Sequence, residues 1–273
     1  MIDAGRPIAR TDLRIAKRSK GVWATVALFV LCFGGLAYAL AALSTPSVDD
    51  YLDITATVAS LLAPLVGIVF GYQAVVGERE SGTIALALSL PHSRRDVITG
   101  KLAARALVLT AALTTGAITG LVVLALRYPT VPLPRYLALY ATTLAYTLAF
   151  LALATAFSTS IRTSRRVMGA AFGSYIALVM LWTDLVDVLV LVLFRFRLDP
   201  TAFPLWAETL KFATPRPLYT YLLADTADVG AGPPGLVVDT QWFASPLVAT
   251  TILLAWLALP PALAALHFHT QEL

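Results

Sequence analysis

GERESGTIALALSLPHSRRDVITGK, residues 77–101, is the stretch around which the rest of the chain is organised. It is a long polar interruption between two strongly apolar runs, and residues 83–90 inside it form a short apolar core. Those eight residues are too few to cross a bilayer, which takes about 20 helical residues. The acids Glu78 and Glu80 precede the core, and basic residues follow it. We therefore expect a short helix that two flanking membrane spans hold at the membrane surface.

The composition indicates a polytopic all-α membrane protein. Of the 273 residues, 58% are hydrophobic and 13% are charged, whereas soluble domains carry about 25% charged residues. The mean hydropathy is +0.78. The net charge of +4 is not read as a nucleic-acid signature, because no basic stripe combines with aromatic residues on a soluble domain. The single cysteine, Cys32, excludes an intramolecular disulfide and a cysteine-based metal site.

One transmembrane domain, 1–273, with six spans is expected. The apolar runs place the spans at about 22–43, 54–76, 102–126, 136–157, 167–187 and 245–267. Residues 1–20 are either an interfacial helix or a solvated basic tail. The segment 77–101 is the surface segment between spans two and three. Residues 188–244 form an outer region with prolines and short amphipathic pieces such as 205–212.

Two acids decide where the fifth span is expected to end. Asp184 and Asp187 interrupt apolar residues that continue to Phe194. At a bilayer centre each Asp would cost about 3 kcal/mol, so we end the span near residue 187. The two acids either face one cavity or lie at the outer headgroup level, and the second reading is favoured.

The distribution of basic residues predicts the orientation. With the N-terminus inside, 14 of the 20 Lys and Arg residues lie on the cytoplasmic side. Because cytoplasmic loops carry an excess of Lys and Arg, both termini are expected in the cytoplasm, together with residues 77–101.

Inside the spans, small residues predict close helix packing. Glycines four residues apart let helix backbones approach each other, and three spans carry such a pair: Gly67/Gly71, Gly116/Gly120 and Gly169/Gly173. Packing within the chain is favoured over a specific dimer face. Pro64 is expected to kink the second span or to free a carbonyl.

Capping signals divide the surface segment into parts. Ser81 and Gly82 break the preceding helix, and Thr83 can cap a new one. Its apolar side would hold four residues, Ile84, Leu86, Leu88 and Leu90. Pro91 ends it, and Ser93 with Asp96 can start the next helix. Such a helix suits a hydrophobic groove on a partner, with Arg94 and Arg95 setting the register; the alternative is a plain interfacial loop.

These residues resemble a known family. The run Glu78-Arg79-Glu80-Ser81-Gly82-Thr83, then Leu90-Pro91-His92-Ser93-Arg94-Arg95, then Gly100-Lys101 is similar to the cytoplasmic loop of ATP-binding-cassette (ABC) permeases of the type 2 exporter class. Six spans, the N-terminal run 8–14 and the long outer region fit the same family, so the resemblance covers essentially the whole chain. The chain is most similar to the subgroup that contains the permease helping to mature nitrous oxide reductase.

The resemblance implies a function and partners. Residues 83–90 would be a coupling helix in a groove of a separate nucleotide-binding ATPase subunit, and the permease would work as a homodimer or heterodimer among membrane lipids. The chain itself would bind no cofactor, with ATP and Mg on the partner. The coupling site would comprise Glu78, Glu80, Gly82, Thr83, Ile84, Leu86, Leu88, Leu90, Pro91, Arg94 and Arg95. Short helices in the outer region would dip back toward the membrane.

The motifs of an enzyme are missing from the sequence. There is no G-x-x-x-x-G-K-[ST] phosphate-binding loop and no H-E-x-x-H. His267 and His269 are two apart and would point to different helix faces. We expect no catalytic residues and no metal site. Two alternatives are kept: a membrane scaffold that anchors an ATPase without a transport path, and, less favoured, an intramembrane enzyme. No cluster of charged or aromatic residues within the spans selects a substrate.

Overall fold

The computed structural model describes residues 19–43, 47–77, 94–195, 204–230 and 244–269, with backbone only for 94–98 and 267–269. The described residues are helical apart from short connections. The helices are α2 (Lys20–Val30), the π-helix η1 (Leu31–Gly35), α3 (Leu36–Leu43), α4 (Val48–Gly71), α7 (Arg94–Arg127), α8 (Leu133–Ser160), α9 (Ser164–Tyr175), the π-helix η2 (Ile176–Leu181), α10 (Trp182–Leu193), α11 (Leu205–Phe212), α12 (Pro215–Ala227) and α13 (Pro246–His269).

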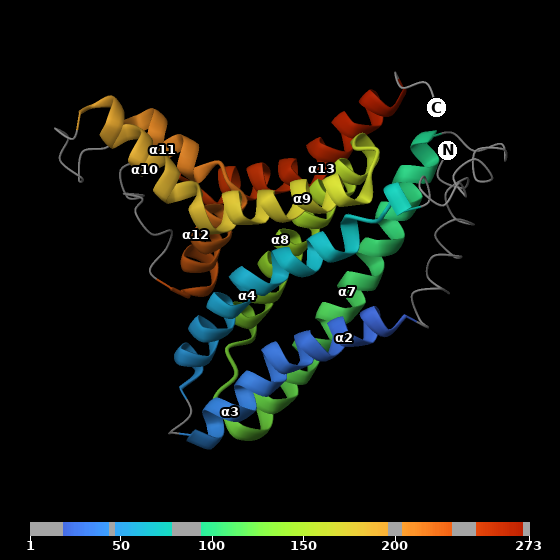
Figure 1. The fold of residues 1–273 in the computed structure, drawn as a ribbon. Coiled ribbons are helices and arrows are strands. Elements are labelled where there is room, and N and C mark those ends of the chain that lie inside the picture. The colour runs from blue at the N-terminus through green and yellow to red at the C-terminus, as the bar shows by residue number, and fades with distance from the viewer. Residues whose placement is uncertain (1–18, 44–46, 78–93, 196–203, 231–243, 270–273) are drawn as a thin grey trace.

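Six of the described helical stretches are long and apolar enough to cross a membrane, as predicted. They are Lys20–Leu43, Val48–Gly71, Thr99–Arg127, Leu133–Ser160, Ser164–Leu193 and Pro246–Leu266. In the ribbon view, one end of the bundle holds the first residues of α2, α7 and α9 and the last residues of α4, α8 and α13 (Figure 1). We call this the basic end, because Lys101, Arg105, Arg162, Arg165 and Arg166 lie at it. The other is the opposite end.

The second span starts earlier than its apolar run. The acids Asp49, Asp50 and Asp53, expected in a loop, lie in the first two turns of α4. The Ser47 hydroxyl accepts a hydrogen bond from the Asp50 amide at 3.3 Å and caps the helix. Acids in a first turn also interact favourably with the helix dipole. Polar residues therefore extend this helix beyond its apolar run.

The centre of the bundle is the antiparallel pair α4 and α8. A Cβ on Gly67 would lie 2.4 Å from the Thr147 carbonyl oxygen, and one on Gly71 would lie 2.8 Å from that of Leu151. Only glycine, which has no Cβ, allows the backbones of α4 and α8 to approach this closely. The predicted packing of this pair within the chain is confirmed.

Pro64 lies inside α4 without ending it, and buried tyrosines satisfy nearby carbonyls. Proline removes the amide that would bond the carbonyl four residues earlier, which here belongs to Ser60. The Tyr146 hydroxyl donates to that carbonyl at 3.2 Å, and the Tyr175 hydroxyl donates to Leu61 at 3.3 Å. The sequence predicted either a kink or a freed carbonyl at Pro64, and the structure adds a partner for the Ser60 carbonyl.

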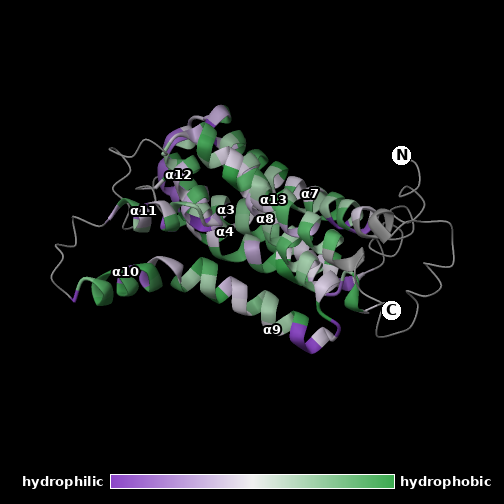
Figure 2. Cartoon of the chain, turned by 90° about the horizontal axis from the view of Figure 1, so that it is seen from above, coloured by the Kyte–Doolittle hydropathy of each residue, from purple (hydrophilic) through white to green (hydrophobic). Residues whose placement is uncertain are grey.

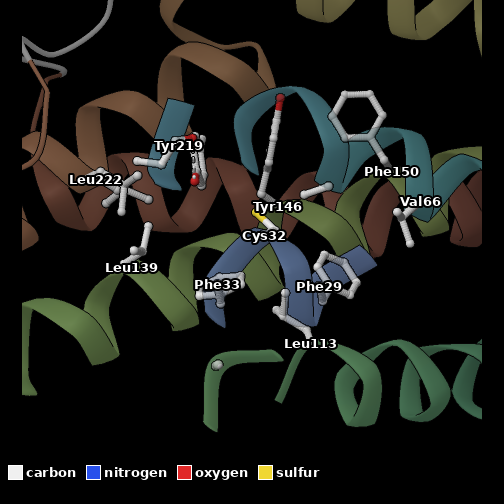
Figure 3. Close-up of a cluster of buried hydrophobic side chains, with 14 of the residues drawn as sticks. Phe29, Cys32, Phe33, Val66, Leu113, Leu139, Tyr146, Phe150, Tyr219 and Leu222 are labelled. Carbon is white, nitrogen blue, oxygen red and sulfur yellow. Dashed lines mark hydrogen bonds between the residues drawn. The ribbon is translucent and has the colours of Figure 1, made fainter. Parts of the chain in front are cut away.

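The first span packs on α7 through the second glycine pair. A Cβ on Gly116 would lie 2.6 Å from the Phe29 backbone, and one on Gly120 would lie 3.0 Å from the Phe33 Cβ. Phe29, Phe33 and Leu113 lie together around Cys32 in the core (Figure 3). Cys32 is buried, as its place in an apolar run suggested.

The fifth span, α9–η2–α10, is the least enclosed part of the bundle together with α13. From above it runs along the edge of the molecule and is mostly apolar beyond its first turn (Figure 2). The third glycine pair lies on it, and a Cβ at Gly169 or Gly173 would meet nothing within 4 Å. Unlike the other two pairs, this one does not serve packing within the described chain.

The helix of the fifth span continues past the expected end at residue 187 to Leu193. Asp187 does not end it, because its carboxylate is ion-paired at 2.5 Å with Lys211 of α11. Asp184 is exposed. After α11, helix α12 enters the bundle, where Leu218 and Tyr219 are fully buried.

Candidate functional site

The predicted coupling residues lie largely outside the described part of the chain. Nine of them fall within 78–93, which the structure does not describe: Glu78, Glu80, Gly82, Thr83, Ile84, Leu86, Leu88, Leu90 and Pro91. Arg94 and Arg95 are the first residues of α7, so that helix begins where Ser93 and Asp96 predicted. The coupling role of all eleven residues remains a prediction, but both attachment points of the segment are described.

The first attachment point is residues 72–77, which follow the end of α4. Ala74, Val75 and Val76 are buried. The Ser158 hydroxyl of α8 accepts hydrogen bonds from the Val75 and Val76 amides at 2.9 and 3.0 Å. Amides past a helix end need partners when they are buried, and Ser158 satisfies both. The chain entering the segment is therefore fixed to α8.

The second attachment point is the first turns of α7. The Arg105 guanidinium donates to the carbonyls of Phe70 and Gln73 at the end of α4. Cations are favoured at a helix C-terminus, where carbonyls lack helical partners. Lys101, one turn earlier, is 3% exposed. The chain leaving the segment is thus fixed to the end of α4.

Because both attachment points are fixed, displacement of residues 78–93 must act on α4, α7 and α8 together. Three exposed arginines stand at the same end: Arg162 in the connection between α8 and α9, and Arg165 and Arg166 in the first turn of α9. They add positive charge to the basic end. The described chain thus connects both ends of residues 78–93 to the central helices α4 and α8.

A second region, which the sequence did not reveal, lies toward the opposite end. A cavity of about 320 Å³ opens between α4 and α12. Its polar lining residues are Asp53, Thr57, Ser60, Arg216, Tyr219 and Thr220. Arg216 falls in the expected outer region 188–244, whereas α12 carries it into the bundle. There it donates to the carbonyl of Val179 in η2.

The hydroxyl groups around this cavity are held by backbone carbonyls. Ser60 donates to the Thr57 carbonyl at 2.7 Å, and Tyr219 donates to the Ala56 carbonyl at 3.3 Å. Tyr219 also stacks on Tyr146, with ring centroids 4.6 Å apart. Burial raises the pKa of the Tyr219 phenol well above its ordinary range, so this group stays a neutral hydrogen-bonding group.

A third polar cluster joins α10 and α11. Lys211, with no exposed side-chain surface, lies 2.5 Å from Asp187 and 3.3 Å from Glu208. The sequence interpretation considered Asp187 with Asp184 and missed Lys211. No group of three or more His, Cys, Asp or Glu residues gathers within the part of the chain that the structure describes. The side chains of His267 and His269 lie outside it.

Comparison with protein families gives one match over almost the whole chain. The model described as "ABC-2 family transporter protein" matches residues 6–273. The chain belongs to the ABC-2 transporter family. Together with the six spans, this makes it a multi-pass protein of the cell membrane, and it confirms the resemblance that residues 78–101 carry.

Curated relatives of this ABC-2 protein match over shorter stretches. A protein of Stutzerimonas stutzeri named "Probable ABC transporter permease protein NosY" is 35% identical over 115 residues, which are 40% of this chain and 41% of the relative. A protein of Pseudomonas aeruginosa with the same name is 35% identical over 108 residues, 37% of this chain and 38% of the relative. The chain thus matches about two-fifths of the length of these relatives.

Arg216 of this ABC-2 chain could have been noticed from one signal in the sequence. The segment TPRPLY places an arginine between two prolines just before an apolar run. Proline is favoured in the first helical turn, so the pattern indicates a helix start with a cation in its first turn. The burial of that helix depends on α8, which is distant in sequence, and on α13, which follows a connection whose course the sequence does not specify.

Proposed function

We propose that the chain is the permease subunit of an ATP-driven ABC exporter. ATP and Mg would bind a separate nucleotide-binding subunit, and residues 77–101 would be the coupling segment on the cytoplasmic side. The proposal is supported by membership of the ABC-2 family and by the printed names of the relatives. The observation that carries the coupling role is the double attachment of the segment, to Ser158 on one side and through Arg105 on the other.

The test is co-purification with an ATPase encoded next to this chain. We expect Leu86→Asp with Leu88→Asp to abolish ATPase binding, because two carboxylates cannot enter an apolar groove without losing hydration. The control is Thr130→Asp, which adds an acid to an exposed loop at the opposite end. Intact ATPase binding and stimulation in the double variant would refute the coupling role.

The fifth span supports a further part of the proposal, a dimer of permease subunits. Gly169, Gly173 and Ile176 recur at helical spacing on an exposed stripe of the α9–η2 helix. Ile176 is 48% exposed, and a Cβ at Gly169 or Gly173 would meet nothing within 4 Å among the described residues. Small residues let a second helix approach closely, so this face suits a second copy or a related permease.

A bulky side chain introduced on this stripe tests whether the stripe forms the dimer interface. We expect Gly173→Trp to shift the purified protein from dimer to monomer, measured as mass in detergent. Val122→Trp, at an apolar position that is 51% exposed on α7, is the matched control and should keep the dimer. A monomer for both variants and the parent protein would refute the dimer.

The scaffold alternative makes a different prediction in vesicles. A scaffold would bind the ATPase and leave every candidate substrate on its original side, whereas an exporter would move one in an ATP-dependent manner. Vesicles containing both subunits, compared with and without ATP, separate the two functions.

A further inference from the structure

The cavity between α4 and α12 contains a charge that the bundle leaves unbalanced. Arg216 is half-buried and donates to the Val179 carbonyl. Val179 is the sixteenth of the thirty residues in the span Ser164–Leu193, so the guanidinium lies near the middle of the bundle. Among the ion pairs of the described residues, which involve Arg135 and Lys211, none includes Arg216.

A cation at this depth is unfavourable unless a partner balances it. Ionisable residues within membrane segments are rare and mark binding sites or transport paths. The carbonyl of Val179 accepts one N–H group, but a guanidinium has five. The first turn of α12 contains no acidic residue, and a helix N-terminus itself carries partial positive charge. The guanidinium and the helix end therefore both attract an anion.

The acid nearest to this cavity is engaged elsewhere. Asp53 lines the cavity, and its Oδ1 accepts a hydrogen bond from the Gly230 amide at 2.8 Å. Asp53 is exposed and belongs to the first two turns of α4, where the helix dipole favours it. It is thus the polar rim of the cavity rather than the counter-ion of Arg216.

The remaining lining fits a small group that is part polar and part apolar. Thr57 and Thr220 contribute hydroxyls, and Ala56, Leu223 and Val229 contribute apolar surface. A volume of about 320 Å³ is at the lower end of small-molecule sites, which span about 300–1,000 Å³. The cavity has room for a headgroup or a small ester, and not for a folded peptide. Arginine is the residue that binds phosphate most specifically, through paired N–H groups.

From this geometry we propose that the Arg216 cavity binds the phosphate group of a small amphiphile, carried either by a lipid headgroup or by a soluble ester. The claim that this amphiphile is the substrate of the exporter rests on the function proposed above. The claim that the cavity binds a phosphate group does not depend on that function. The phosphate accepts hydrogen bonds from the guanidinium, the Thr57 hydroxyl closes the outer side, and the apolar wall receives the adjoining carbon atoms.

The experiment measures binding to the purified full chain in detergent, by the rise in its thermal unfolding midpoint. The probes are inorganic phosphate, dihexanoyl phosphatidylglycerol, and dihexanoylglycerol as the lipid without phosphate. We expect the phospholipid to raise the midpoint and dihexanoylglycerol to leave it unchanged. A rise with the phospholipid alone assigns the ligand to lipid headgroups, and a rise with inorganic phosphate as well assigns it to soluble anions too.

The variant that decides the proposal is Arg216→Gln, which removes the charge but keeps an N–H donor for Val179. Hydrogen bonds from a charged donor are stronger than neutral ones, so we expect the affinity for the phospholipid to fall about tenfold or more. Arg216→Lys should keep part of it. Arg162→Gln, the same change at an exposed position of the basic end, should bind like the parent protein. Equal binding by Arg216→Gln and the parent, or no binding by the parent, would overturn the proposal.

A second variant covers the case in which Arg216→Gln does not fold. Thr57→Phe narrows the cavity from its exposed side and leaves Arg216 and its bond to Val179 unchanged. Unchanged affinity in Thr57→Phe would also overturn the proposal. ATPase co-purification is measured separately on the parent protein. A parent that retains the ATPase but binds no phosphate probe refutes the cavity alone, and a parent that binds the probe but not the ATPase refutes the exporter alone.

Discussion

Lys211 shows how a single side chain can determine where an element ends. It is the only basic residue of α11, and its ammonium has no exposed surface. Asp187 and Glu208 balance it from α10 and from α11 itself. The apolar residues Val186, Val190 and Ala207 pack beside this group. The cluster thus ties the end of the fifth span to the chain that follows it.

We expect Lys211→Met to destabilise the protein strongly, because Glu208 is 3% exposed and would keep an unpaired charge. Breaking a buried ion pair from one side costs about 3–5 kcal/mol. The measurement is the free energy of unfolding in detergent. The double variant Lys211→Met with Glu208→Gln removes the uncompensated charge and should recover part of the loss. A double variant less stable than Lys211→Met would contradict this explanation.

Pro64 and Tyr146 provide a second test at the scale of single residues. The Tyr146 hydroxyl bonds the Ser60 carbonyl, which has no helical amide partner because residue 64 is proline. Tyr146→Phe should therefore cost about 1–3 kcal/mol, the penalty of an unsatisfied buried group.

In the background Pro64→Ala the helix supplies that amide, so the same change should cost clearly less. A double-mutant cycle measures this difference as a coupling energy. A coupling energy of zero would show that Tyr146 acts only through packing of its ring.

Among the helices, the three glycine pairs have the same four-residue spacing but different surroundings. Two pairs pack against another helix of the chain, whereas a Cβ at either glycine of the third would meet no described atom within 4 Å. Gly67 faces the α8 backbone, and Gly169 faces open space. We expect Gly67→Ala to destabilise the protein by about 1–3 kcal/mol, since the new methyl must push α4 from α8.

The matched change Gly169→Ala should be neutral or stabilising by up to about 1 kcal/mol, because alanine favours helix. Unfolding in detergent measures both variants. Equal destabilisation would argue that Gly169 packs within the same chain.

The elements were predictable where their signals are local. Six apolar runs predicted six spans, and the helix start at Arg94 followed from Ser93 and Asp96. Helix boundaries that depend on polar side chains were not predictable from the sequence. The cap at Ser47 moved the start of α4 back to Val48, and the pairing of Asp187 with a lysine 24 residues later let α10 continue. Hydropathy alone cannot anticipate a charge that a distant partner neutralises.

At the scale of the whole molecule, the sequence indicated a membrane protein of a known family but not its internal polar site. The predicted coupling segment has a contiguous pattern, so it could be proposed without a structure. The Arg216 cavity combines residues of α4 and α12 that are more than 150 positions apart. No periodicity connects Thr57 with Arg216, and only the entry of α12 into the bundle brings them together.

Burial is uneven across the bundle, which bears on how it assembles. The spans formed by α4 and α8 are each 56% buried over their most apolar windows, whereas that of α9–α10 is 17% buried. A span this exposed can face lipid, but lipid contact does not require glycine. Glycines on this stripe are more useful if another helix packs closely against them. The central pair is the most enclosed part of the described bundle, and the fifth span is the side that we propose for a second subunit.

The two attachment points of the coupling segment lead to a prediction for the complete transporter. If motion of the ATPase reaches the bundle through the ends of residues 78–93, loosening those ends should reduce coupling without preventing binding. We expect Ser158→Ala and Arg105→Gln to co-purify with the ATPase as well as the parent does. Their substrate-stimulated ATPase activity and ATP-dependent transport in vesicles should fall several-fold, because the hydrogen bonds to Val75, Val76 and Gln73 are lost.

The matched control for these variants is Thr115→Ala, which removes an exposed hydroxyl of α7 that bonds only its own helix. It should leave coupling intact. Loss of ATPase binding in Ser158→Ala would mean that the anchor shapes the docking surface itself. Full coupling in both anchor variants would mean that motion enters the bundle elsewhere, and Arg162, Arg165 and Arg166 at the start of the fifth span would be the next positions to replace.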